Sequence, residues 1–367
     1  MKETKPDYND CITNVACSIL KYFKVPYKHN TISDIDEVLE KNNPKNVVLI
    51  LYDGMGYNLI NRILNEDDFL RVNMTRSIST VCPSTTTAAT TSILSGMNPS
   101  EHNWLGWDMY VKEEDKIITL FLNTYKDTYK VAAPYNIASK YYGYKNLIEQ
   151  INDGKYSAGI VSLHGGVHYK NLSDMNDKII EQIGMPGRRF VYVYHENPDS
   201  IMHEHGTDSI ESINSFKEIN RSTEELASRL KDTLLIVVAD HGHMNSMPIT
   251  ISEYKDFFDT LDGDVSIEAR FCSFKVKEDK KDEFVKLFNL YFSKWFILKT
   301  KEEIIREFWF GRGDYNKYYR ASLGDYFAIA TSNRYFRYNE NSVNLVSMHA
   351  GITEDEMRVP LIMKLIK

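Results

Sequence analysis

Continuous apolar runs of strand length recur along this chain, with helical patterns between several of them. The clearest run is residues 46–52 (NVVLILY), which is typical of a strand buried on both faces of a sheet. Shorter runs follow at residues 131–133, 158–163, 190–194 and 234–239. Residues 212–230 carry apolar side chains at helical spacing. Strands that alternate with helices predict an α/β fold in which a doubly wound, mostly parallel sheet is flanked by helices.

The stretch from residue 251 to residue 329 departs from this alternation. Residues 268–276 have the pattern of an exposed strand, and residues 281–292 and 300–308 have the pattern of helices. We therefore predict an α/β core formed by residues 1–250 and 330–367. Residues 251–329 would form a small inserted α+β subdomain that acts as a cap or lid.

The amino-acid composition limits the classes of molecule that this protein could bind. The net charge is −7 and no basic stripe stands out, which argues against a stable nucleic-acid complex. A nucleotide or another small phosphorylated molecule remains possible, because a bound metal can supply positive charge locally. The four cysteines are scattered and no segment reaches the ~18 apolar residues of a membrane span, so we expect no membrane insertion and a cytoplasmic location.

A run of hydroxylated side chains, Ser84 to Thr87, precedes an apolar segment that ends at Gly96. This order predicts a helix with a capped start and a glycine stop. A hydroxyl at the start of a helix lies where backbone N–H groups and the helix dipole stabilise an anion such as phosphate. The alternative is that these residues only cap the helix.

Potential metal ligands follow three of the predicted strands. Asp53 follows the first strand, Asp199 and His203 follow the strand at 190–194, and Asp240 and His241 follow the strand at 234–239. Ligands bind at the carboxyl ends of parallel strands. Taken singly, each residue has another explanation: a turn residue, a surface hydrogen bond or a structural histidine.

The distribution of histidines strengthens the metal interpretation. Six of the ten histidines fall in three short stretches: His195, His203, His205, His241, His243 and His349. Carboxylates and neutral imidazoles are ligands for zinc and similar divalent ions, and paired metals recur in enzymes that displace groups at phosphorus. We therefore predict a site for two divalent ions, most readily Zn²⁺, with Mn²⁺ or Fe²⁺ also compatible.

The ordered set of motifs resembles the alkaline phosphatase superfamily, most closely its nucleotide pyrophosphatase/phosphodiesterase branch. The set is Asp53-Gly54, the threonine run before Ser95-Gly96 with Pro99 and His102, Asp199-x-x-x-His203, Asp240-His241-Gly242 and His349-x-Gly351. The resemblance implies one metal site made of Asp53, Thr86, Asp240 and His241. It implies a second site made of Asp199, His203 and His349.

The resemblance also implies a nucleophile. Family members place the catalytic threonine ten residues before the glycine of the helix end, which selects Thr86 in this chain, with Thr85 and Ser84 as alternatives. One position departs from the family: Trp107 stands where an asparagine helps to bind the phosphoryl oxygens. Asn103 is a nearby substitute, and Trp104 and Trp107 could either stack on a base or pack against the lid.

These observations predict a two-metal hydrolase that cleaves a phosphodiester or nucleotide pyrophosphate bond through a covalent phosphothreonine. One alternative is a phosphomonoesterase or phosphonate hydrolase that uses the same site. Such a site needs more positive charge, which Arg312, Arg320 or Arg334 could supply. A further alternative is a metal-binding protein without catalysis.

Overall fold

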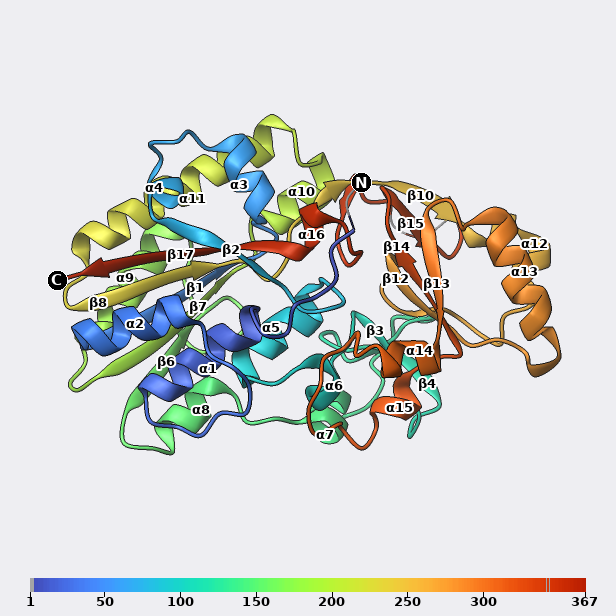
Figure 1. The fold of residues 1–367 in the computed structure, drawn as a ribbon, viewed down its shortest axis with the longest axis horizontal. Coiled ribbons are helices and arrows are strands. Elements are labelled where there is room, and N and C mark those ends of the chain that lie inside the picture. Colours follow the sequence, from blue (N-terminus) through green and yellow to red (C-terminus); the bar gives the residue numbers. More distant parts are fainter. Residues whose placement is uncertain (1–2, 341, 343) are drawn as a thin grey trace.

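The computed structural model describes residues 3–340, 342 and 344–367, and its central sheet has six strands in the order β2-β17-β8-β1-β7-β6 (Figure 1). The strands are β1 (Asn46–Tyr52), β2 (Met74–Ser79), β6 (Ser157–Val161), β7 (Arg189–His195), β8 (Thr233–Val238) and β17 (Arg358–Ile366). β6, β7, β1 and β8 are parallel, whereas β17 runs antiparallel to β8 and β2. All seven residues of β1 are buried, as its continuous apolar run predicts.

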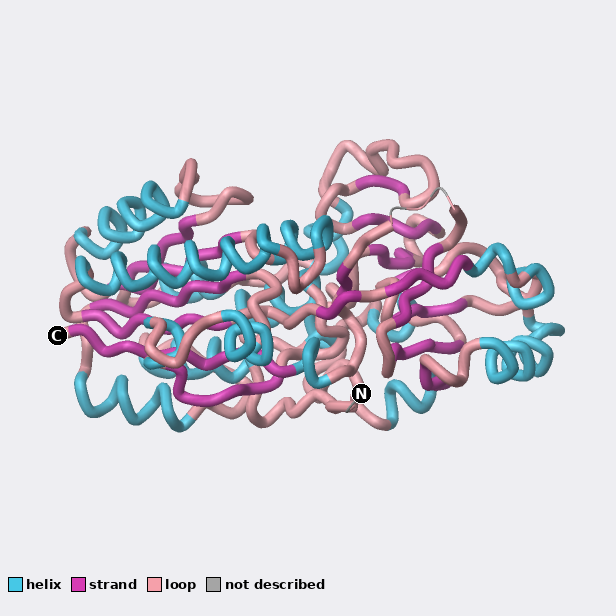
Figure 2. The backbone as a smooth tube through the Cα atoms, turned by 90° about the horizontal axis from the view of Figure 1, so that it is seen from above, coloured by secondary structure: helices cyan, strands magenta, loops and turns pink. Residues whose placement is uncertain are grey.

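Helices cover both faces of this sheet (Figures 1 and 2). One group consists of α1 (Ile12–Tyr22), α2 (Ser33–Asn42), α5 (Thr86–Ser95), α6 (Pro99–His102) and α8 (Leu147–Asn152). The other group packs around α11 (Ile210–Arg229) and contains α3 (Tyr57–Ile63), α4 (Phe69–Val72), α9 (Leu172–Gly184) and α10 (Asp199–His205). The predicted α/β fold with a helix-flanked, mostly parallel sheet is therefore confirmed.

A second sheet occupies the other half of the elongated molecule, at the right of Figure 1. Its seven strands have the order β13-β14-β12-β11-β3-β4-β5. They are β3 (Asp108–Val111), β4 (Lys116–Thr119), β5 (Thr124–Tyr125), β11 (Ser266–Ile267), β12 (Phe271–Phe274), β13 (Phe296–Thr300) and β14 (Tyr326–Ala330). The helices of this half are α7 (Ile137–Tyr142), α12 (Lys255–Phe258), α13 (Lys281–Tyr291), α14 (Lys301–Arg306) and α15 (Tyr319–Ser322).

The second sheet differs from the predicted insertion in two respects. β3 to β5, which we assigned to the core, belong to the same sheet as the strands of residues 266–330, because Ile267 of β11 lies opposite Asp108 of β3. β12 was expected to be exposed, but all four of its residues are buried because it lies between β14 and β11.

The apolar run at residues 131–133 is not a strand of the core. Val131 forms only an isolated bridge with Thr124 and is 71% exposed. Three apolar residues are too few to define a buried strand, and the chain here runs along the edge of the second sheet, next to β5.

Short elements join the two halves. β9 (Met244–Asn245) pairs with β16 (Ser347–Met348), and β10 (Met247–Thr250) pairs with β15 (Arg334–Arg337). α16 (Glu354–Met357) then leads into β17, and two short 3₁₀ turns lie at Ile251–Glu253 and Glu278–Lys280.

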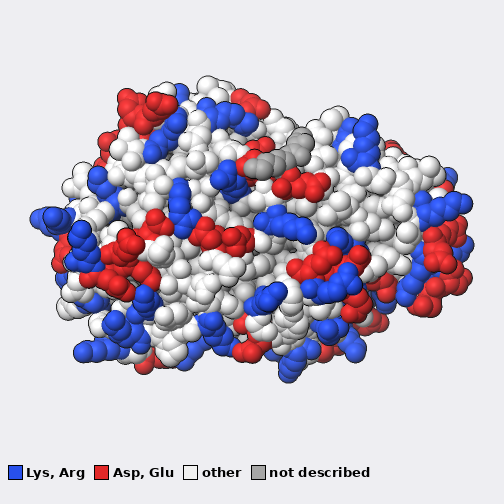
Figure 3. Space-filling view, viewed as in Figure 1, with Lys and Arg blue, Asp and Glu red and all other residues white. Residues whose placement is uncertain are grey.

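Basic and acidic side chains are interspersed on the face shown in Figure 3. In the described part of the chain, no helix combines the length and the apolar character that crossing a membrane requires.

Candidate active site

The predicted ligands gather at the carboxyl ends of three adjacent parallel strands. Asp53 directly follows β1, Asp199 begins α10 shortly after β7, and Asp240 and His241 follow β8. Since β7, β1 and β8 are neighbours in the sheet, their ends converge at one edge. His349 reaches the same edge from the segment that follows β16.

Thr86 is the hydroxyl that faces this cluster. It is the first residue of α5, and its Oγ1 lies 3.4 Å from Oδ2 of Asp53 and 3.2 Å from Nε2 of His241. The two alternative hydroxyls are engaged elsewhere. Ser84 donates to the carbonyl of Gly351 at 2.8 Å, and Thr85 donates to Oε1 of Glu268 at 2.6 Å.

Asp53, Asp240 and His241 form what we call the carboxylate half of the site. Nε2 of His241 lies 3.4 Å from Oδ1 of Asp53 and 3.4 Å from Oδ2 of Asp240. Oδ1 of Asp240 accepts hydrogen bonds from the backbone N–H groups of Gly54 and His241, at 3.0 and 2.9 Å. Oδ2 of Asp240 is buried and has no hydrogen-bond partner among the described residues.

The electrostatics of the carboxylate half favour a bound cation. Burial raises the pKa of Asp53, and the charges of Asp240 and Asp199 raise it further. Burial also raises the pKa of Asp240. Two buried carboxyl groups, one with an unpartnered oxygen, are costly unless a cation neutralises them. The residues of this half therefore fit a divalent metal ion.

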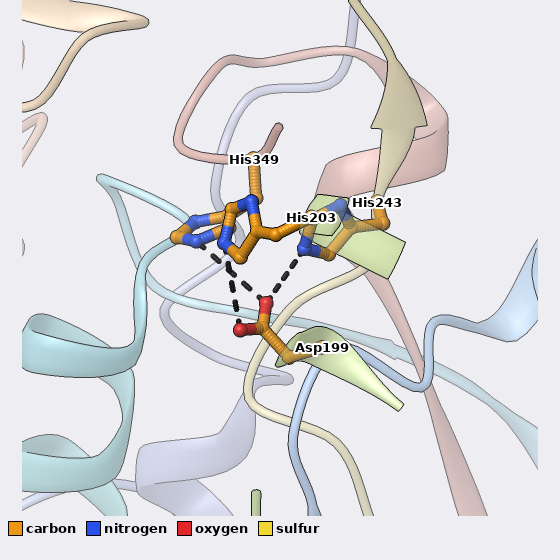
Figure 4. Close-up of side chains that lie close together, drawn as sticks. All are labelled: Asp199, His203, His243 and His349. Atoms are coloured by element: carbon orange, nitrogen blue, oxygen red, sulfur yellow. Dashed lines mark hydrogen bonds and ion pairs between the residues drawn. The ribbon is translucent and has the colours of Figure 1, made fainter. Parts of the chain in front are cut away.

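Asp199, His203, His243 and His349 form the imidazole half (Figure 4). Nε2 of His243 lies 2.6 Å from Oδ1 of Asp199, Nε2 of His203 lies 3.4 Å from Oδ2, and Nε2 of His349 lies 3.8 Å from Oδ1. Burial alone would raise the pKa of Asp199, but the surrounding histidines hold it well below its ordinary value.

The histidines of this half are oriented by their other ring nitrogens. Nδ1 of His203 lies 2.8 Å from the carbonyl of Ser347, and Nδ1 of His349 lies 3.0 Å from the carbonyl of Ser84. Because a carbonyl only accepts hydrogen bonds, each Nδ1 carries the proton and each Nε2 keeps its lone pair. That tautomer is the one that binds a metal through Nε2.

The structure adds two residues to which the sequence assigned no role. His243 belongs to the imidazole half, and its Nδ1 lies 2.7 Å from Oγ of Ser347. Its spacing of two residues from His241 was visible, but the motif that resembles the family has no ligand there. Tyr194, at the end of β7, donates a hydrogen bond to Oδ2 of Asp53 at 2.5 Å.

A cavity of about 500 Å³ adjoins the cluster, and the two tryptophans Trp104 and Trp107 lie differently with respect to it. Thr86, His203 and His349 line it from the first sheet, and Trp107 lines it from the second. Trp104 instead donates through Nε1 to the carbonyl of Tyr142 at 3.0 Å, so its ring is held away from the cluster.

Asn103 and the three arginines that we predicted to contact the phosphate do not line this cavity. Asn103 is fully buried and donates to Oγ of Ser322 at 2.9 Å. Arg312, Arg320 and Arg334 are likewise absent from the lining, where the cationic side chains are Lys126 and Arg337. Arg337 lies three residues after Arg334, at the end of β15, and lines the cavity.

Comparisons with known proteins agree with this architecture. The family model of the type I phosphodiesterase / nucleotide pyrophosphatase family matches residues 47–343. The structure of murine ectonucleotide pyrophosphatase / phosphodiesterase 5 is similar with a TM-score of 0.69 and 17% identity, over 86% of this chain and 87% of that one. Its inactive threonine-to-alanine variant in complex with AMP is similar with a TM-score of 0.69, 16% identity and the same coverage.

A phosphonate-cleaving enzyme has a similar fold. Phosphonoacetate hydrolase from Sinorhizobium meliloti 1021, in complex with phosphonoformate, has a TM-score of 0.62 and 13% identity, over 88% of this chain and 91% of that one. A sequence search of curated proteins gave no match. The family model covers well over half of the chain, which therefore belongs to the type I phosphodiesterase / nucleotide pyrophosphatase family of hydrolases, within the alkaline phosphatase superfamily.

Proposed function

We propose that this hydrolase cleaves a phosphodiester or nucleotide pyrophosphate bond with Thr86 as its nucleophile. The observation that carries the proposal is the position of the Thr86 hydroxyl, at the start of a ten-residue helix and within 3.5 Å of Asp53 and His241. A threonine hydroxyl is a weak nucleophile unless its surroundings lower its pKa. The inactivity of the related threonine-to-alanine variant supports this role.

The two halves of the site would hold two divalent ions, most readily Zn²⁺, with Mn²⁺ or Fe²⁺ also compatible. Asp53, Thr86, Asp240 and His241 would hold one ion, and Asp199, His203 and His349 would hold the other. When bound, such ions supply positive charge that activates the hydroxyl and stabilises the leaving oxygen.

The side chains of the site define the reaction steps. Thr86 Oγ1 forms a bond to phosphorus as its proton leaves toward the carboxylate of Asp53, and the bond to the leaving alcohol or phosphate breaks. The product is a phosphothreonine ester, which water then hydrolyses to regenerate the hydroxyl. The N-terminus of α5 stabilises the negative charge of the phosphoryl oxygens through its backbone N–H groups.

The cavity suggests a small phosphorylated substrate with an aromatic group, such as a nucleotide. Trp107 lines the cavity and is 42% exposed, so part of its ring is free to stack on a base. AMP in the complex of the murine relative is consistent with such a ligand.

Hydrolysis of a phosphate monoester or a phosphonate is the second candidate. Lys126 and Arg337 line the cavity and would add the positive charge that a doubly charged phosphoryl group requires. The similar fold of phosphonoacetate hydrolase makes this candidate worth testing directly.

The test is to compare kcat/KM for bis-p-nitrophenyl phosphate, p-nitrophenyl phosphate and phosphonoacetate, using zinc-loaded wild type, Thr86→Ala and Thr86→Ser. We expect the diester to be preferred, Thr86→Ala to be inactive with normal metal content, and Thr86→Ser to retain part of the activity. Full activity in Thr86→Ala would refute the nucleophile. A preference for the monoester or the phosphonate would favour the second candidate.

A further inference from the structure

Glu268 brings a carboxyl group from the second sheet to the start of α5, where the proposed nucleophile lies. It lies in the turn between β11 and β12 and lines the same cavity as Thr86, His203 and His349. Its Oε1 accepts a hydrogen bond from Oγ1 of Thr85 at 2.6 Å and another from the backbone N–H of Trp107 at 2.8 Å. Thr85 is the residue directly before the proposed nucleophile.

The turn that carries Glu268 is fixed to the segment of His349. Arg270 is fully buried, and its Nε and Nη2 donate to Oε1 and Oε2 of Glu356 at 2.6 and 2.8 Å. Glu356 also accepts a hydrogen bond from the backbone N–H of Gly351 at 2.7 Å, two residues after His349. Glu268 is thus held beside the cluster by a buried ion pair.

The two oxygens of Glu268 are not equivalent. Oε1 is occupied by two donors, whereas Oε2 has no hydrogen bond or ion pair with any of the residues that the structure describes. When the carboxyl group is protonated, the proton belongs on Oε2, because Oε1 already accepts two hydrogen bonds. Oε2 then becomes a donor.

The surroundings of Glu268 make its protonated form accessible at neutral pH. Burial raises the pKa of Glu268 to about 7, and the negative charge of Asp108 adds to this effect. The hydrogen bonds from Thr85 and Trp107 and the positive charge of Lys126 oppose it. Lys126 itself is turned to Asp108 and Asp264, whose carboxylates lie 3.4 and 3.7 Å from its Nζ.

We infer that Glu268 is a catalytic residue that donates a hydrogen bond from Oε2 to a non-bridging oxygen of the phosphoryl group attacked by Thr86. This inference rests on the proposed function. An ionised carboxylate would repel the phosphoryl group, so arrival of the substrate further favours the protonated form. A preorganised donor of this kind stabilises charge that develops in the transition state.

The test compares Glu268→Gln and Glu268→Ala with wild type, using bis-p-nitrophenyl phosphate over a range of pH. The protonated carboxyl donates, so wild-type kcat/KM should fall as the pH rises through about 7. The corresponding fall in kcat should lie at higher pH, because kcat reports the substrate complex. Glutamine keeps an acceptor for Thr85 and Trp107 and donates at every pH, so Glu268→Gln should lose this fall.

Loss of the donor in Glu268→Ala should lower kcat by about 100- to 1000-fold. Glu302→Gln is the matched control, because Glu302 lies on α14 with 72% of its side chain exposed and outside the cavity. Thermal unfolding and metal content establish that each variant is folded and loaded. If Glu268→Ala does not fold, the pH profile of the isosteric Glu268→Gln still tests whether Glu268 donates the hydrogen bond.

The outcomes separate this inference from the proposed function. Wild-type diesterase activity with the same alkaline fall in Glu268→Gln would leave Glu268 a purely structural residue and overturn the inference alone. A wild type that does not cleave diesters would overturn the proposed function and this inference with it. Loss of the fall in Glu268→Gln, with Glu302→Gln unchanged, would support both.

Discussion

The two halves of the site contain similar residue types but balance their charges differently. In the carboxylate half, Asp53 and Asp240 share one close histidine, and burial raises the pKa of both carboxyl groups. In the imidazole half, Asp199 alone faces three histidines, and its pKa is lowered despite burial. The carboxylate half therefore needs a cation to relieve the repulsion between its two buried carboxyl groups, whereas the imidazole half holds a single carboxylate whose ionised form the neighbouring imidazoles already favour.

Substitutions in the Arg270–Glu356 ion pair, which lies next to the imidazole half, should have the largest effect on stability. Removal of one partner of the buried Arg270–Glu356 pair, in Arg270→Met or Glu356→Gln, should cost about 3–5 kcal/mol of the free energy of unfolding. Glu356 also holds the backbone near His349, so zinc binding by the imidazole half should weaken. Chemical denaturation and zinc titration measure the two effects, and unchanged stability would contradict the structure here.

The same pair gives a pH dependence with a definite sign. Burial opposes ionisation of Glu356, but Arg270 and the hydrogen bonds of Thr353 and Gly351 hold its pKa below the ordinary value of 4.5. A lowered pKa contributes stability that is present above the ordinary value and is lost as the pH falls below it. Glu356→Gln should therefore lose less stability than wild type between pH 5 and pH 3, as denaturation at each pH would show.

Replacement of one carboxylate in each half tests the comparison itself. Asp240→Asn and Asp199→Asn should each reduce activity more than about 100-fold. Substitution of a residue that only hydrogen-bonds to a metal ligand already reduces activity or metal affinity by ~10–100-fold. The effects of the two substitutions on the metal-free protein should be opposite. Asp240→Asn removes repulsion with Asp53 and should raise the melting temperature. Asp199→Asn removes the carboxylate that contacts His243 at 2.6 Å and lies among three histidines, and it should lower the melting temperature.

Calorimetry of the chelated proteins measures this difference, with Asp262→Asn, an exposed aspartate on the second sheet's side, as the control. Two shifts of the same sign would show that the halves do not differ as described.

The residues that the sequence missed provide a smaller test on each half. His243→Ala should weaken zinc binding by about 10- to 100-fold, because it removes the 2.6 Å partner of Asp199. Tyr194→Phe removes one hydrogen bond to the carboxylate of Asp53 and should cost about 10-fold in activity. Metal titrations that resolve two affinities should show each substitution acting on its own half, and equal effects on both would break the distinction.

The sequence predicted the core of the fold because the signal there is local. The continuous run at residues 46–52 and the acidic residue that follows it identify a buried parallel strand and its functional end. The ends of β7 and β8 follow by the same reasoning. Thr86 and His349 needed the resemblance, because nothing in their own segments brings them to the sheet edge.

The second sheet could not be predicted in the same way. β3 to β5 join this sheet through β3 alone, whose partner β11 lies more than 100 residues later, and short antiparallel strands carry no signal for a distant partner. The position of Glu268 beside Trp107 depends on that pairing. The sequence shows His243 as one of several clustered histidines, but only the structure shows that it contacts Asp199 and belongs to the imidazole half.

The central claim is that Thr86 is the nucleophile. Mass spectrometry of enzyme that is quenched during turnover of bis-p-nitrophenyl phosphate tests this claim most directly. Attack by Thr86 releases p-nitrophenolate and leaves a p-nitrophenyl phosphate ester on the protein. We expect this adduct on the peptide that contains Thr86, and we expect it to be absent in Thr86→Ala. An adduct on Thr85 or Ser84, or full turnover by Thr86→Ala with no adduct at this position, would contradict it.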